Sequence, residues 1–149
     1  MVFWGNRFQK VSAAWFDENW AYRQTITISN AGSAQTDYQV MFTLDTASLT
    51  TDKMQSDCDD IRVTDSSGNP ISFWIETGCD SSTTRIWAKV PSIPAQSSGD
   101  TTAIFVYYGN PNAKGISSVR DTFIPNSIWM ITGDCPTGQA DCNQTDNNT

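Results

Sequence analysis

The 149-residue chain contains no histidine, and this absence excludes several kinds of catalytic and metal site. A Ser-His-Asp triad, a Cys-His pair and a His-ligated zinc site all need an imidazole group. Basic residues are also scarce, because nine Lys and Arg stand against 16 Asp and Glu, for a formal net charge of −7. Nucleic acids and anionic membrane surfaces need clustered basic side chains, so we expect neither as a partner.

Two residue types that favour helices are almost missing, since the chain has only two Leu and two Glu. By contrast it has 14 Asp and 34 Ser and Thr, whose side chains compete with the hydrogen bonds of a helical backbone. This composition excludes a helical bundle and favours strands and loops. The length predicts one domain that is large enough to bury a core.

Long hydrophobic runs are absent as well. A membrane-spanning helix needs roughly eighteen apolar residues, and we expect no transmembrane segment in this chain. The apolar start at residues 1–4 is interrupted at residues 5–7, whereas a secretory signal needs about seven apolar residues in a row. We therefore expect either that a segment no longer present directed export, or that the sequence is a fragment of a longer protein.

What the chain does contain is a series of short apolar or alternating segments separated by turn-forming residues. A polar turn at residues 65–70 predicts that the strands on either side of it form a β-hairpin. Six strands with no helical pattern between them predict an all-β domain over residues 17–123, an antiparallel β-sandwich of jelly-roll or immunoglobulin-like type. The six expected strands are residues 22–28, 38–44, 61–64, 71–75, 85–90 and 103–108.

Residues 1–16 place large apolar side chains at the spacing of one helical face, at Trp4, Phe8, Val11 and Trp15. This spacing predicts a short amphipathic N-terminal helix. The helix either lies against the sheet of its own subunit or forms an assembly interface with a neighbouring one, because exposed aromatic patches commonly mark interfaces.

The four cysteines are Cys58, Cys79, Cys135 and Cys142, and none of them forms a CxxC pair. Their spacing therefore fits neither a zinc ribbon nor a thioredoxin-like redox site. Three pairings are possible. We favour Cys58 with Cys79, which bracket two expected strands, and Cys135 with Cys142, which close a small polar loop. Free buried thiols are the alternative, whereas disulfides would indicate an oxidising compartment outside the cytoplasm.

Residues 124–149 are too few for a second domain, and we expect a short strand followed by the disulfide-closed tail. Asn143 and Asn147 each begin a tripeptide that fits the N-glycosylation pattern. Such tripeptides also arise by chance in a tail rich in Asn and Thr. They are consistent with an exported glycoprotein.

Acidic residues are densest at Asp57, Asp59 and Asp60, which makes this loop a candidate calcium site. The alternative is a solvated turn in which Asp60 accepts hydrogen bonds from the backbone or from Arg62. No pair of carboxylates can be nominated for glycoside hydrolysis. We therefore expect no enzyme, and no cofactor apart from this calcium candidate.

Aromatic side chains on the expected strands offer a second kind of site. Trp and Tyr on an exposed sheet face can stack on sugar rings, and the candidates are Trp74, Trp87, Tyr107 and Tyr108. The alternative is that these four side chains fill the core, which is the commoner position for a strand Trp. The two readings differ in whether a row of rings is exposed on one sheet face.

Five short motifs occur in one order along the chain: residues 20–23 (WAYR), 37–40 (DYQV), 59–63 (DDIRV), 86–91 (IWAKVP) and 107–110 (YYGN). Together they resemble the extracellular prokaryotic family known as domain of unknown function 2341. The resemblance covers about residues 15–123. It implies a β-sandwich module of secreted or surface proteins, often placed before a lectin-like domain and in some cases carried on pilin-like or adhesin-like chains. No catalytic residues are established for that family, so none is carried over.

Together these observations predict an extracellular or cell-surface structural or adhesive protein. It would associate with copies of itself, as in a pilus-like surface filament. The alternative is a carbohydrate-binding module of a secreted protein, with glycans as partners.

Overall fold

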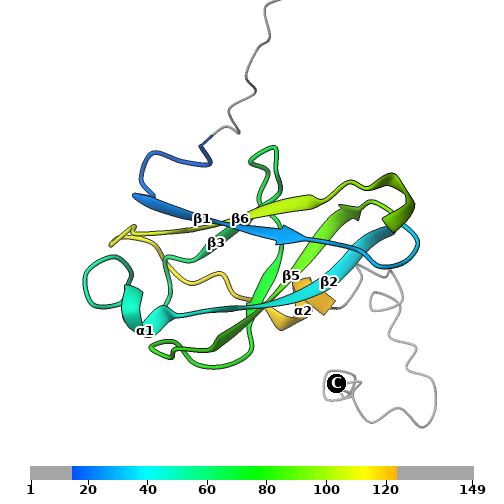
Figure 1. Cartoon of the computed structure of the whole chain (residues 1–149). Helices are drawn as coiled ribbons and strands as arrows, with labels where there is room; N and C mark the ends of the chain where they lie inside the picture. Colours follow the sequence, from blue (N-terminus) through cyan, green and yellow to red (C-terminus); the bar gives the residue numbers. More distant parts are fainter. Residues whose placement is uncertain (1–14, 124–149) are drawn as a thin grey trace, which may run out of the picture.

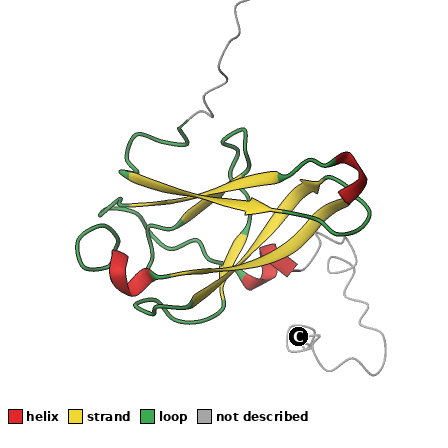
Figure 2. Ribbon diagram, in the orientation of Figure 1, coloured by secondary structure: helices red, strands yellow, loops and turns green. Residues whose placement is uncertain are grey.

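The structure is a computed structural model, and it describes residues 15–123 (Figure 1). Strands dominate this part of the chain, and the helices are short (Figure 2). In chain order the elements are β1 (Tyr22–Ile28), β2 (Gln35–Leu44), α1 (Thr46–Leu49), β3 (Arg62–Thr64), β4 (Phe73–Ile75), β5 (Thr84–Ile93), a 3-10 helix (Gln96–Ser98), β6 (Thr102–Tyr108) and α2 (Val119–Phe123).

The six strands form two three-stranded antiparallel sheets that lie one above the other (Figure 1). The strand order is β1-β6-β3 in the first sheet and β2-β5-β4 in the second. The predicted all-β antiparallel sandwich is therefore confirmed. The predicted N-terminal helix falls on residues outside the described part of the chain.

Strand β5 shows why the alternating segments were recognisable in the sequence. Thr84, Ile86, Ala88 and Val90 are buried between the sheets, while the residues between them face outward. Strand β6 is the middle strand of its sheet and is buried on both faces along its second half, which explains its continuous apolar run. In both strands the sequence pattern follows from the number of faces that are covered.

The predicted hairpin around residues 65–70 is wrong in its pairing. Backbone bonds do close the turn, with Asp65 N–H donating to Asn69 O at 2.9 Å. However, β3 pairs with β6 in the first sheet, and β4 pairs with β5 in the second. Only an isolated bridge between Thr64 and Pro70 remains of the hairpin, because the chain crosses from one sheet to the other just after the turn.

The two faces of β6 belong to two hydrophobic clusters. Ile104 and Val106 point into the main core between the sheets, together with Ile61 and Ile86, and all four are fully buried. Phe105 and Tyr107 point to the outer face, where they pack with Trp20 and Phe16. The segment before β1 therefore covers the outer face of the first sheet.

The two sides of the sandwich differ in whether their outer sheet edges are covered by other parts of the chain. On the side of β3 and β4 the chain closes both edges: Ile71 N–H donates to Val63 O at 2.9 Å, and Ser118 N–H donates to Phe73 O at 2.9 Å. On the side of β1 and β2, no other described strand pairs with either edge. These two strands are joined by the loop of residues 29–34, so their open edges lie on the same side (Figure 1).

Truncation of a core side chain tests this packing. Replacing Ile86 with Ala should lower the free energy of unfolding by about 2–5 kcal/mol, because the side chain is fully buried and leaves a cavity. Met41 lies on β2 and is 45% exposed, so Met41→Ala should change it by less than about 0.5 kcal/mol. Urea denaturation followed by tryptophan fluorescence measures both; equal losses would contradict the described core.

Candidate functional site

A buried carboxylate holds together one end of the sandwich. Asp60 is fully buried, and one of its oxygens accepts the N–H of Gly109 at 2.6 Å and the N–H of Asn110 at 3.2 Å. The other oxygen accepts the N–H of Gln55 at 3.2 Å. Its main-chain oxygen accepts the indole N–H of Trp20 at 2.6 Å. The loop before β3, the end of β6 and the segment before β1 therefore meet at this residue.

Close packing at Gly109 brings the start of β1 against the end of β6. Gly109 has a φ of 92°, and a Cβ atom there would lie 2.7 Å from the ring of Tyr22 and 3.1 Å from Lys53 O. Only glycine fits, because other residues rarely adopt this φ and would also clash. The ring of Tyr22 stacks on Tyr108 with centroids 5.6 Å apart, and burial, together with Tyr22, raises the pKa of Tyr108.

Three of the five motifs that carry the family resemblance meet here. Trp20 and Tyr22 come from the first motif, Asp60 from the third, and Tyr108 and Gly109 from the fifth. The sequence could place these motifs on a strand end, a loop and a second strand end. No local pattern in the sequence indicates that hydrogen bonds join these three motifs.

Beside Asp60 lies an open cavity of about 440 Å³, which the sequence analysis did not identify. It lies where the loop before β3 faces the beginning of β1 and the residues after β6. Residues from three separate stretches of the chain form it, so no single motif marks it. The lining residues are Ala21, Tyr22, Asp52, Lys53, Met54, Gln55, Asp60, Gly109 and Pro111.

Arg62 fixes the loop that carries the acidic residues. Its guanidinium donates to the main-chain oxygens of Asp59 at 2.9 Å and Lys114 at 2.7 Å, and it lies over the ring of Trp20 at 5.1 Å. Burial lowers the pKa of Arg62, while Asp60 and Asp59 act in the opposite direction. A guanidinium remains charged in proteins, so Arg62 acts here as a fixed cation and hydrogen-bond donor.

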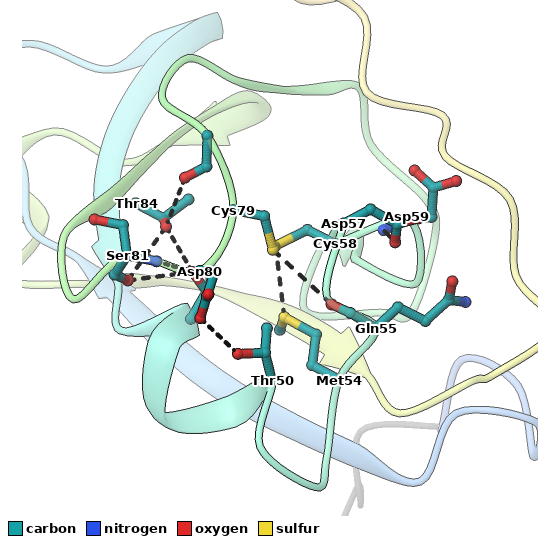
Figure 3. The surroundings of a disulfide bond; sticks show 12 residues. Thr50, Met54, Gln55, Asp57, Cys58, Asp59, Cys79, Asp80, Ser81 and Thr84 are labelled. Carbon is teal, nitrogen blue, oxygen red and sulfur yellow. Dashed lines mark hydrogen bonds between the residues drawn. A yellow bond between two sulfur atoms is a disulfide. The ribbon is translucent and has the colours of Figure 1, made fainter.

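The predicted disulfide between Cys58 and Cys79 is present, with Cα atoms 5.7 Å apart (Figure 3). It joins the loop before β3 to the loop between β4 and β5. The Sδ atom of Met54 lies 3.7 Å from the Cys58 sulfur, and Thr50 Oγ1 donates to Asp80 Oδ1 at 2.9 Å, which ties the same two loops a second time. The disulfide therefore lies next to the Asp60 network.

The three carboxylates of the calcium candidate do different things. Asp60 accepts backbone N–H groups, as the alternative expects, but it is fully buried rather than solvated. Asp57 is exposed and accepts the N–H of Asp59 at 3.1 Å. Across residues 15–123, no three His, Cys, Asp or Glu side chains come together as metal ligands. The structure does not assemble Asp57, Asp59 and Asp60 around one point.

The four aromatic residues of the predicted sugar platform do not share a surface. Tyr107 is 0% exposed beneath the segment before β1, and Tyr108 is buried at the end of the core. Trp74 and Trp87 face each other across β4 and β5 in the other sheet, where Phe123 packs against both rings. The reason is geometric, because neighbouring residues of a strand point to opposite faces and the four lie in two sheets.

Trp15 is the one member of the predicted assembly interface that lies within the described residues. It packs edge-on against Tyr107 with centroids 5.3 Å apart, and its indole N–H donates to Trp20 O at 3.0 Å. The guanidinium of Arg23 lies over both the Trp15 ring and the Phe105 ring. This residue therefore covers the sheet of its own domain, which is the alternative that the sequence left open.

Several predicted sites lie outside the described residues. They are the remaining interface positions Trp4, Phe8 and Val11, the cysteines Cys135 and Cys142, and the glycosylation candidates Asn143 and Asn147. Within residues 15–123, none of the helices has the length and apolar character needed to cross a membrane.

Comparison with known proteins gives one family. A family model described as "Domain of unknown function (DUF2341)" matches residues 57–140, more than half of the chain. The match begins in the loop with Asp60 and includes β3 to α2. No curated protein and no solved structure matches the sequence.

Substitution of Asp60 tests the network at this end of the sandwich. Asp60→Asn should lower the free energy of unfolding by about 1.5–3 kcal/mol, since an amide nitrogen would face backbone N–H groups that now donate to a carboxylate. Asp57→Asn removes a charge from an exposed position and should cost less than about 0.5 kcal/mol. Urea denaturation compares the two, and a neutral Asp60→Asn would refute this role.

Removal of the disulfide tests how much the link between Cys58 and Cys79 stabilises the fold. Because the bridge closes a loop with a sequence separation of 21, the double variant Cys58→Ala/Cys79→Ala should lose about 3 kcal/mol of unfolding free energy. Alkylation of the native protein without reductant should leave both cysteines unlabelled, as seen by peptide mass spectrometry. Labelling of Cys58 or Cys79 before reduction would show that the bridge is absent.

Proposed function

Because the chain belongs to the family described as Domain of unknown function (DUF2341), whose name assigns no activity, we propose its function from the fold. The protein is an extracellular structural or adhesive module that associates with copies of itself in a surface filament. The observation that supports this proposal is that, within residues 15–123, the sheet edges are covered on one side of the sandwich and open on the other. The chain covers the edges on one side of the sandwich and leaves β1 and β2 uncovered among the described residues.

An uncovered edge strand offers a row of backbone donors and acceptors to another chain. Strand β2 is ten residues long and is paired with β5 along only one of its edges. It contains no Pro and one charged residue, Asp37, which has a φ of 50° and lies near the start of the strand, so the stretch from Tyr38 to Leu44 is uncharged. Natural sheets commonly block such edges with charge, proline or a covering segment. On the opposite side the chain does so, since Ile75 N–H donates to Ser117 Oγ at 2.9 Å beside the Ser118 contact.

We take the occupant of the β2 edge to be an extended segment of a neighbouring copy. Strand addition supplies backbone hydrogen bonds for affinity and side-chain contacts for specificity. Two exposed apolar side chains of β2, Tyr38 (51% exposed) and Met41 (45% exposed), are available for such contacts. A contact between two different surfaces of identical subunits repeats without closing into a ring, which is the geometry of a filament.

We also propose an extracellular location, which rests on the disulfide. The disulfide between Cys58 and Cys79 would be stable in an oxidising compartment and is unusual in the cytosol. We propose a binding and structural function without catalysis. The alternative of a carbohydrate-binding platform at Trp74, Trp87, Tyr107 and Tyr108 is not favoured, because these rings lie on different surfaces.

Charge placed on the open edge tests the proposal. The double variant Tyr38→Lys/Met41→Lys should weaken self-association by about tenfold or more, because two ammonium groups would have to be desolvated at the contact. On net charge alone the opposite is expected, since two added positive charges reduce the repulsion between copies of a chain at −7. Sedimentation velocity over a concentration series measures the effect.

The matched control is Ile116→Lys/Val119→Lys, which adds the same charge at two similarly exposed apolar residues that are not part of β2. It should associate as strongly as the parent protein. A parent protein that remains monomeric at every concentration would contradict the proposal, as would equal effects of the two double variants.

A further inference from the structure

The cavity beside Asp60 has the dimensions of a small-molecule site. Its volume of about 440 Å³ lies within the range of roughly 300–1,000 Å³ that is typical of ligand pockets. It lies at the end of the sandwich, where β1 begins and β6 ends. It is therefore separate from the outward-facing edge of β2 that the proposed function uses, and the inference does not depend on that function.

The walls of this cavity are held in place by contacts already described. The Tyr22 ring stacks on Tyr108 and lies close to Gly109. The side-chain amide of Gln55 donates to Asn110 O at 2.7 Å, and the Asp60 carboxylate binds the backbone on both sides. Preorganised walls reduce the entropy that a ligand loses on binding.

The lining combines an aromatic ring with donors and acceptors. Tyr22 is 40% exposed, and Met54 and Pro111 add further apolar lining. Asp52 and Lys53 are exposed and line it as well, together with the buried Asp60. The Asp60 carboxylate is already bonded to backbone N–H groups, so the exposed charges of the lining are one acid and one base. Such a pair gives no net preference for an anion or a cation, whereas it can accept from and donate to neutral hydroxyl groups.

We propose that this cavity binds one sugar ring of a neutral saccharide. A pyranose has an apolar face of C–H groups that can stack on Tyr22, and hydroxyls at its rim that can bond to Asp52 and Lys53. This site differs from the four-residue platform expected from the sequence. None of Trp74, Trp87, Tyr107 and Tyr108 lines the cavity, although Tyr108 supports Tyr22 from behind.

The test is nuclear magnetic resonance of the ¹⁵N-labelled protein titrated separately with glucose, galactose, mannose and N-acetylglucosamine at millimolar concentrations. At least one sugar should shift the amide signals of residues 52–55 and 109–111 in a saturable way. Tyr22→Ala should weaken this binding by about tenfold or more, because the stacking surface is removed, while Tyr22→Phe should retain it. Tyr38→Ala, a matched loss of an exposed tyrosine on β2, should bind like the parent.

Since Tyr22→Ala also removes support from Tyr108, the double variant Asp52→Asn/Lys53→Gln provides a second measurement. It changes two exposed lining groups, and should weaken binding about tenfold with the fold intact, as judged by the unchanged signals of the core. The proposal is overturned if none of the four sugars shifts these signals, or if the variants bind as well as the parent. It is also overturned if sodium phosphate or lysine shifts them more strongly than every sugar.

Discussion

The buried carboxylate of Asp60 is the interaction on which one end of the sandwich depends. It accepts N–H groups from Gln55 and Gly109, while its main-chain oxygen accepts the Trp20 indole. An uncompensated charge in the interior would be costly, so the loop before β3 and the end of β6 must stay where these bonds are satisfied. The disulfide at Cys58 lies two residues away in the same loop, and Asp60 itself lines the cavity beside Tyr22.

A second constraint concerns the backbone groups at the sheet edges. On the side of β3 and β4 the turn at residues 65–70 and the segment before α2 supply partners from within the domain. On the side of β1 and β2 the described chain supplies none, although β2 is one of the two longest strands. The same molecule therefore has a closed side and an open side, which is the basis of the proposed self-association.

The strands could be predicted from the sequence because each buries one or two faces, and alternation or continuous apolar runs report this directly, as in β5 and β6. The pairing of β3 and β4 could not be predicted, since a turn signal is local and the partners of both strands lie elsewhere along the chain. The opposite orientation of Tyr107 and Tyr108 follows from strand geometry and was available in the sequence. The cavity was not, because it needs three distant segments to meet at Asp60.

Electron cryo-microscopy of the purified native material shows whether the open side of the sandwich is occupied. If β2 is the contact for self-association, the images will show filaments in which an extended segment of a neighbouring subunit lies along β2 and continues the β2-β5-β4 sheet. Strictly monomeric particles under all conditions, or filaments in which the β2 edge faces solvent, would contradict this role of β2.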